Sequence, residues 1–343
     1  MTAPARLLVF ASFPLLVAWG LWSAPAAVWF VTLGVQAGIA LLECLPALRT
    51  SPPPAAAATG WDRAIPRLHG VLQLGLLAFG VALCATGQPS VGLVVLAGLA
   101  VGWVTGTLGI TLAHELGHSR SAIDRAAAWL LMGSVLYAHF MVEHYRGHHV
   151  RAATHDDPAS ARLGESLWRF LPRTLAGSWR SAWALEAARL SRHQRPWLTS
   201  PLAWATFAQV ALLLALAATF GWRAVLFWVV QAAYAVLLLE TVNYIEHYGL
   251  QRRQEGEGGR FEPFGAGHAW GADHRICNFL LVNLQRHADH HMHPWKPYPT
   301  LQVQDGPRLP ASYAGSVFLA WCSPLWFRAM RTRLPEAGRS GPG

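Results

Sequence analysis

Histidines in four short clusters are the residues of this chain whose spacing points most directly to chemistry. Nine of the sixteen histidines fall in these clusters. In the last cluster His287, His290 and His291 stand at positions i, i+3 and i+4, so a helix would place their imidazoles on one face. Imidazole nitrogens bind Zn, Cu, Fe and Ni. The predicted metal ligands are His114, His118, His144, His148, His149, His247, His287, His290 and His291.

The number of histidines limits the kind of metal site. His114, Glu115 and His118 match the H-E-x-x-H motif of zinc proteases, in which the glutamate is the general base. An intramembrane zinc protease is therefore an alternative, but such a site needs only one further ligand. Nine imidazoles suit two metals with about four or five ligands each. The spacing alone does not name the metal, assign each histidine to one ion or identify a bridging ligand.

Acidic residues accompany every cluster. Carboxylates that hold the second ring nitrogen of a ligating histidine fix its orientation and offset the metal's charge. Glu240, a further candidate, lies within an apolar stretch two helical turns before His247. An ionisable residue inside a membrane span suggests a functional role. No single catalytic side chain is assigned. The candidate carboxylates are Glu240, Glu246, Asp289, Glu115 and Glu143.

The composition indicates a membrane protein. The chain has 343 residues, of which 53% are hydrophobic and only 13% are charged, whereas soluble domains carry about 25% charged residues. Its net charge of +9 comes almost wholly from arginine, since Lys296 is the only lysine. No basic run with interleaved aromatic residues points to nucleic acid. Arginine enrichment of cytoplasmic loops explains the charge instead.

Six apolar stretches are long enough to predict membrane-spanning helices. They predict an all-α fold, a six-helix membrane bundle with a cytoplasmic helical cap that carries the histidine clusters. We expect residues 1–335 to form one domain and residues 336–343 to be a disordered tail. The predicted spans are residues 7–23, 26–42, 68–86, 91–113, 202–220 and 224–245.

The distribution of arginines predicts the orientation of these spans. Residues 119–200 contain eleven arginines, which places this loop in the cytoplasm by the positive-inside rule. Six spans then put both termini on the same side. Spans four and six lead directly into His114 and His247, so the metal site would face the cytoplasm.

Two further apolar stretches are predicted not to cross the membrane. If residues 126–142 crossed, His114 and His144 would lie on opposite sides and could not share one site. We therefore predict an interfacial or re-entrant hairpin there. Residues 313–326 are too short to span and are interrupted by Pro324.

The four cysteines form no C-x-x-C pair, which excludes a fused four-thiolate iron centre. The chain also has no flavin motif or dinucleotide fingerprint. If it performs redox chemistry, its electrons must come from a separate protein.

The clusters together resemble one known family. The phrases HELGH (114–118), EHYRGHH (143–149), NYIEHYG (243–249) and LQRHADHH (284–291) are similar to the bacterial membrane-bound alkane 1-monooxygenases. These are relatives of xylene monooxygenase and the membrane fatty-acid desaturases. The likeness includes residues 157–162, 239–242 and 294–301 and covers roughly residues 100–330. Ser119, Tyr145 and Ala288 differ from the usual family form, but none of them replaces a ligand.

This resemblance implies a non-haem centre of two Fe ions in the bacterial inner membrane. With O2 as co-substrate, it would hydroxylate the terminal methyl group of an n-alkane to a 1-alkanol. A separate rubredoxin and rubredoxin reductase would deliver the electrons. An alkylarene methyl group or a lipid acyl chain remains an alternative substrate. Chain-length preference and oligomeric state are not predicted.

Overall fold

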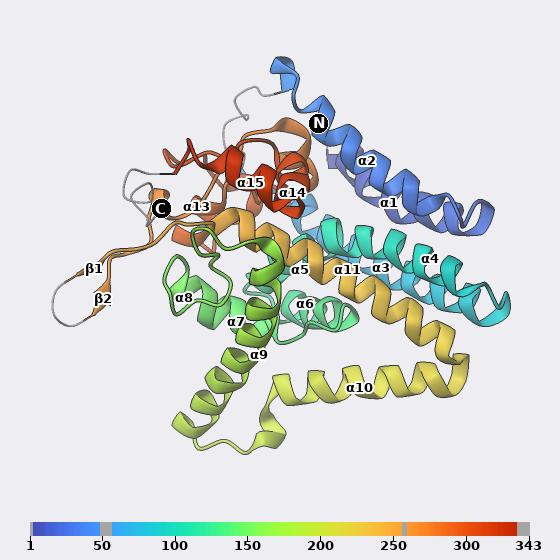
Figure 1. The fold of residues 1–343 in the computed structure, drawn as a ribbon. Coiled ribbons are helices and arrows are strands. Elements are labelled where there is room, and N and C mark those ends of the chain that lie inside the picture. Colours follow the sequence, from blue (N-terminus) through green and yellow to red (C-terminus); the bar gives the residue numbers. More distant parts are fainter. Residues whose placement is uncertain (1–2, 49–56, 256–258, 335–343) are drawn as a thin grey trace. The chain divides into compact units, whose positions relative to one another are not determined.

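The computed structural model describes residues 3–48, 57–255 and 259–334, and this part of the chain is predominantly helical (Figure 1). The predicted disordered tail, residues 336–343, lies outside the described residues. The α-helices are α1 (Ala3–Ser23), α2 (Val28–Leu42), α3 (Gly60–Thr86), α4 (Val91–Val104), α5 (Ile110–Gly117), α6 (Ala122–Ser134), α7 (Phe140–Glu143), α8 (His149–Arg151), α9 (Leu167–Arg192), α10 (Pro201–Phe220), α11 (Trp222–His247), α12 (Arg275–Leu280), α13 (His287–Met292), α14 (Tyr313–Trp321) and α15 (Ser323–Met330).

Shorter elements connect these helices. Two π-helical segments, η2 (Thr105–Gly109) and η3 (His144–His148), continue into α5 and α8. The strands β1 (Gln254–Glu255) and β2 (Arg260–Phe261) form an antiparallel hairpin. The 3-10 turns are η1 (Pro46–Leu48), η4 (Trp197–Thr199), η5 (Ala266–His268) and η6 (Tyr298–Thr300).

Five helical stretches within the described residues are long and apolar enough to cross a membrane. They are Arg6–Ser23, Gly60–Thr86, Val91–Gly117, Pro201–Phe220 and Trp222–His247. Each coincides with a predicted span. The remaining predicted span corresponds to α2, an apolar helix of 15 residues, which is shorter than the roughly 20 residues that a crossing requires. The count of six spans therefore stays a prediction.

The chain divides into two compact units. The first consists of Met1–Val35, Ala58–Met141 and Glu186–Leu239, and the second of Gln36–Ala57, Val142–Leu185 and Glu240–Gly343. The first unit holds most of the apolar helices and the second holds α8, α12, α13, α14 and α15. Helix α11 contributes its first part to the first unit and, from Glu240 onward, its last two turns to the second.

Small residues allow the helices of the first unit to approach closely. A Cβ atom on Gly102 would lie 2.7 Å from the backbone oxygen of Gln231, and one on Gly106 would lie 2.8 Å from the Cα atom of Ala235. Small residues at helix contacts are typical of membrane bundles. The hydroxyl of Thr105 donates to Oε1 of Gln231 at 3.0 Å, which links the π-helical segment η2 to α11.

Both apolar stretches that were predicted not to span are broken in the structure. Helix α6 ends at Ser134, and Leu136 adopts a positive φ of 55° before α7 begins. In the second unit Cys322 separates α14 from α15, and Pro324 stands in the first turn of α15. A proline lacks the N–H that would continue the preceding helix.

Candidate metal centre

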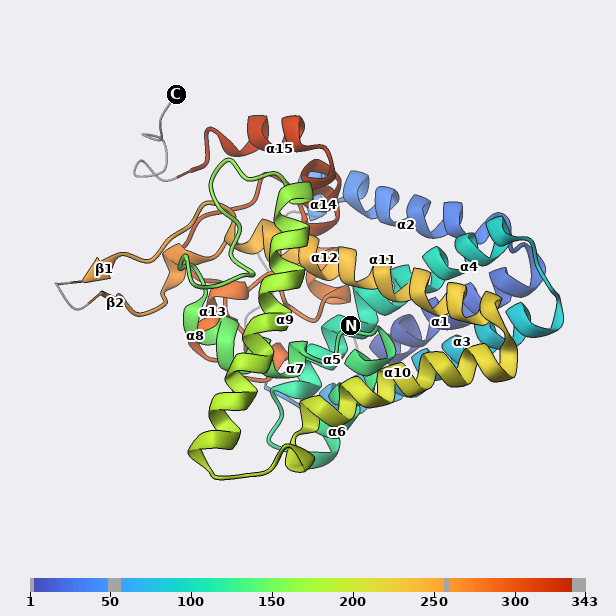
Figure 2. The same ribbon diagram turned by 60° about the horizontal axis from the view of Figure 1, so that its bottom comes forward.

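A π-helical segment determines how the histidines of residues 143–149 are divided. In an α-helix His144 and His148 would point the same way, but His144–His148 is π-helical, which shifts the pairing to residues five apart. The Nε2 atoms of His144 and His149 lie 3.0 Å apart as a result. His148 joins a different group. In the ribbon of the second unit α8 lies beside α13, which carries the last cluster (Figure 2).

Four buried histidines of the second unit form the first group: His148, His247, His287 and His291. Each offers a ring nitrogen, and these four atoms all lie within 4.8 Å of one another. The Nε2 atom of His287 lies 2.9 Å from that of His291 and 3.2 Å from that of His247. Two nitrogens that bind one metal at about 2.1 Å and at a right angle would be about 3.0 Å apart. The group thus has the spacing of a metal ligand set.

Two imidazoles of this group are held by hydrogen bonds at the other ring nitrogen, and a third has a carboxylate nearby. His148 directs Nδ1 at Oδ2 of Asp157, 2.9 Å away. His247 directs Nδ1 at the backbone oxygen of His268 at 3.2 Å, and Nδ1 of His287 lies 3.2 Å from Oε1 of Glu246. An acceptor at Nδ1 selects the tautomer that carries its proton there and leaves a lone pair on Nε2.

This chemistry fits a bound cation. Imidazole nitrogens whose lone pairs face one another repel, and a metal ion would replace that repulsion with bonds to the metal. The Nε2 atom of His148 is buried and has no hydrogen-bond partner among the described residues. Burial, with nearby histidines, lowers the pKa of His291 well below its usual value. A neutral imidazole is the form that binds metal.

A second group in the same unit contains His144, His149 and His290. The Nε2 atom of His149 lies 3.0 Å from that of His144 and 3.2 Å from that of His290. Burial first, and then the neighbouring His149 and His148, lower the pKa of His290 well below its usual value. Three converging imidazoles could supply part of the ligand set of a second ion.

The first unit holds the remaining predicted ligands. His114 and His118 stand one turn apart at the end of α5, and their Nε2 atoms lie 3.2 Å apart. His114 is buried and His118 is half-buried. This pair has the same nitrogen spacing as the groups of the second unit.

One predicted carboxylate lies next to a predicted ligand, and a second holds the helix that carries three of them. Glu246 is buried, approaches His287 and accepts a hydrogen bond of 2.8 Å from the hydroxyl of Tyr313. Asp289 is also buried and accepts from Nζ of Lys296 at 3.0 Å and from the backbone N–H of Gln302 at 2.8 Å. Burial alone would raise the pKa of Asp289, but these donors outweigh it and hold the pKa below its usual value. A charged Asp289 therefore anchors the helix that carries three of the histidines.

The other three predicted carboxylates have different surroundings. Glu240 is buried and accepts from the hydroxyl of Thr174 at 2.9 Å. Glu143 is buried and accepts from Arg151 at 2.7 Å, and burial raises its pKa to about 6. Glu115 is half-buried beside His114 in the first unit. Their predicted roles beside the ligands stay predictions.

Sequence reasoning missed two residues that contact this centre. Asp157 is 1% exposed and accepts from His148, from the hydroxyl of Ser160 at 2.6 Å and from the N–H of Ala159 at 3.1 Å. Its position within the family-like segment 157–162 was the available signal. Tyr313 had none, because its contact with Glu246 joins residues 67 positions apart.

Comparison with known proteins places the chain in a family. Residues 89–314 match the family model described as fatty acid desaturase, which is more than half of the chain. The chain belongs to the fatty acid desaturase family. Together with the five apolar helices, the relatives below identify it as a membrane protein.

Within this family the chain is similar to characterised oxygenases. Alkane 1-monooxygenase 1 of Pseudomonas aeruginosa is 44% identical over 236 residues, which cover 68% of this chain and 61% of the relative. Alkane 1-monooxygenase of Acinetobacter baylyi is 37% identical over 245 residues, 71% of this chain and 60% of the relative. The hydroxylase component of the xylene/toluene monooxygenase of Pseudomonas putida is 29% identical over 235 residues, 67% and 61% of the two chains. The chain thus spans about three fifths of the length of these relatives. These findings give the zinc-protease alternative no support.

Proposed function

We propose that this chain is a di-iron monooxygenase that hydroxylates the terminal methyl group of n-alkanes to 1-alkanols with O2. The observation that carries the proposal is the pair of histidine groups in the second unit, whose Nε2 atoms converge at 2.9–3.2 Å. Imidazole suits iron among other metals. The likeness to alkane 1-monooxygenases favours iron and the alkane substrate.

The ligand set is proposed to include all nine histidines. His148, His247, His287 and His291 would hold one ion. His144, His149 and His290 would hold the other, and His114 and His118 of the first unit remain proposed ligands that are not assigned to either ion. Bound iron would supply the oxidising power for an unactivated C–H bond, which no side chain provides.

The surrounding residues have the complementary tasks. Asp157 and the carbonyl oxygen of His268 orient the imidazoles of His148 and His247 through Nδ1, and Glu246 lies 3.2 Å from Nδ1 of His287. The two carboxylates also offset part of the charge that neutral imidazoles leave uncompensated. Apolar helices would give a water-insoluble hydrocarbon a path from the bilayer. We retain the proposal of six spans, with both termini and the centre on the cytoplasmic side of the bacterial inner membrane.

Electrons are proposed to come from a separate rubredoxin and its reductase, docked on the arginine-rich cytoplasmic side of the chain. Attraction between an acidic donor and exposed arginines weakens as salt screens it. Electron transfer should therefore slow steeply between low and high ionic strength. A rate that is indifferent to salt would contradict this docking mode.

One experiment tests the proposed function most directly. The purified protein would be analysed for metal content and supplied with O2, reduced rubredoxin and one of three substrates: octane, hexadecane or xylene. The proposal expects about two Fe per chain and O2-dependent 1-alkanol. Oxidation of xylene alone would favour the alkylarene alternative, which the xylene/toluene relative supports. Zinc without any oxygenation would refute the proposal.

A further inference from the structure

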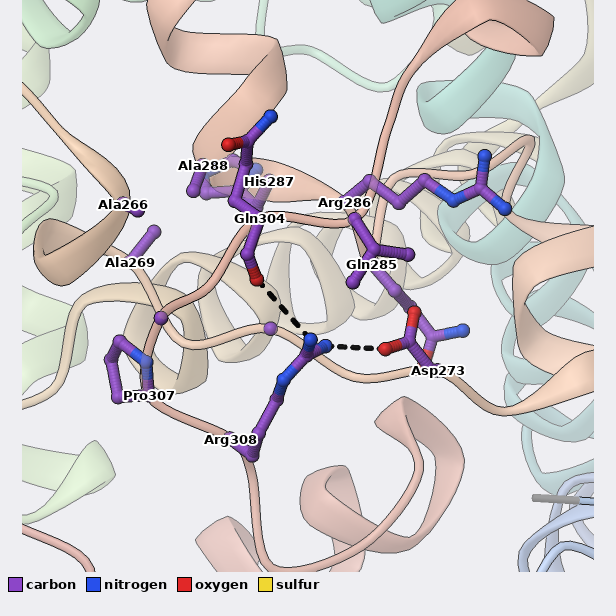
Figure 3. Close-up of a pocket in the computed structure, with 13 residues that line it drawn as sticks. Ala266, Ala269, Asp273, Gln285, Arg286, His287, Ala288, Gln304, Pro307 and Arg308 are labelled. Atoms are coloured by element: carbon purple, nitrogen blue, oxygen red, sulfur yellow. Dashed lines mark hydrogen bonds and ion pairs between the residues drawn. The ribbon is translucent and has the colours of Figure 1, made fainter. Parts of the chain in front are cut away.

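A small pocket in the second unit, lined by polar and apolar side chains, opens beside His287 of the first histidine group. Its lining includes His287 and Ala288 of α13, together with Gln285, Asp273, Gln304 and Arg308 (Figure 3). It has room for about one water molecule, and its mouth is open to solvent. The pocket therefore lies between solvent and a residue proposed to bind metal.

Two side chains that line this pocket each have an oxygen atom that accepts no hydrogen bond from the described residues. Gln285 is 1% exposed, and its Oε1 atom has no hydrogen-bond partner among the described residues. The Oδ1 atom of Asp273 is also buried and likewise has none there, although the side chain as a whole is 22% exposed. The other halves of these side chains are bound: Nε2 of Gln285 donates to the carbonyl oxygen of His274 at 3.1 Å, and Oδ2 of Asp273 pairs with Arg308.

Water is the ligand that best fits these two acceptor oxygens. Buried water typically makes about three hydrogen bonds to polar groups that have no other partner, and both oxygens accept only. An anion would be repelled by Asp273. An apolar ligand would leave both acceptors unsatisfied, at a cost of about 1–3 kcal/mol each.

We propose that this pocket is a water-filled port through which protons reach the metal centre and product water leaves it. The inference rests on the proposed function. Hydroxylation consumes one alkane, one O2, two electrons from rubredoxin and two protons, and it yields one alcohol and one water. The apolar helices that admit the alkane do not suit protons or water. A separate entrance beside His287 meets that need, and its lining includes the ionisable side chains of Asp273, Arg286 and Arg308.

Hydrogen exchange tests the port without any turnover. The N–H groups of Gly271 and Ala272 lie beside the pocket, bonded to the carbonyl oxygens of Pro307 and Gln285. Ala266→Leu would add a larger side chain to the pocket lining. If water fills the pocket, this variant should slow deuterium uptake at those two N–H groups about tenfold. The control Gln302→Leu, an exposed site outside the pocket, should leave it unchanged. Equal uptake in Ala266→Leu and the wild type would overturn the proposal.

Turnover of the iron-loaded enzyme provides the second test. Gln285→Leu removes both the free acceptor and the bond to His274, whereas Gln285→Glu keeps an acceptor and loses only that bond. We expect Gln285→Leu to lower kcat about tenfold, because one hydrogen bond contributes roughly that factor. The KM for the alkane should be unchanged, and the solvent isotope effect on kcat should be larger. Gln285→Glu should restore kcat. If both variants fail alike, Gln285 is only structural and the port is refuted. If the wild type makes no alcohol, the proposed function fails, while the exchange experiment still decides whether the pocket holds water.

Discussion

Replacing Asp157 with asparagine would test whether the carboxylates around the histidines set the metal affinity. In the native chain Oδ2 of Asp157 faces His148 and Ser160, while Oδ1 accepts from the N–H of Ala159. Asparagine has the same shape but only one acceptor oxygen. If its oxygen faces Ala159, its NH2 group faces His148 and forces the proton of that ring onto Nε2. If it is flipped, the NH2 group opposes the N–H of Ala159.

Either arrangement weakens the site by an amount that can be estimated. The first removes the Nε2 lone pair that would bind the metal, and the second leaves two donors face to face in a buried place. A hydrogen bond to a charged group contributes about 1.5–3 kcal/mol. Loss of one such bond corresponds to roughly 10- to 100-fold, which agrees with the usual effect of outer partners on metal affinity.

The assay is competition between the protein and a chelator of known affinity, with bound iron measured by mass spectrometry. Asp157→Asn should lose iron at 10- to 100-fold lower chelator concentration than the wild type. Asp156→Asn is the matched control, because Asp156 is next in the chain but its side chain is 58% exposed. It should bind iron as the wild type does. Wild-type affinity in Asp157→Asn, alongside complete loss in His148→Ala, would refute the reasoning.

Three other outcomes follow from the same geometry. His247→Ala should abolish alcohol formation whereas His193→Ala, at an exposed site outside the clusters, should not, and equal loss in both would mean that the clusters do not form the centre. Tyr313→Phe leaves Glu246 without its hydroxyl donor and should lower stability by about 1–3 kcal/mol, seen as a lower unfolding temperature in detergent; an unchanged temperature would exclude that contribution. Removal of metal by a chelator should destabilise the folded chain, because a metal that binds only the native state stabilises it. Re-addition of Fe²⁺ should restore both the unfolding temperature and the activity. Restoration by Zn²⁺ alone would argue against iron.

Helical spacing is a local property, so the sequence alone can predict which histidines of one helix converge. Residues three or four positions apart on a helix are neighbours whatever the rest of the chain does. The pairs His114–His118 and His287–His291 accordingly have converging Nε2 atoms. The apolar stretches likewise coincide with helices, because crossing a bilayer requires a continuous run of apolar residues.

The spacing of the histidines did not predict how residues 143–149 divide between the two groups, because residues 144–148 form a π-helix. The π-helical segment His144–His148 pairs His144 with His149, five positions on, and sends His148 to the other group. An α-helical pattern cannot predict this division, because it depends on the extra residue in the π-helical turn.

By itself, the sequence therefore determined a predominantly helical membrane chain, the identity of its candidate ligands and the chemistry that imidazole and carboxylate groups allow. Only the tertiary structure decided which histidines of the second unit share a group and which partner fixes each ring. It also placed the buried oxygens of Gln285 and Asp273 around one pocket. The physical reason is distance along the chain. A helical turn fixes its neighbours locally, whereas contacts such as those from Tyr313 to Glu246 or from His247 to His287 form only when remote segments pack together.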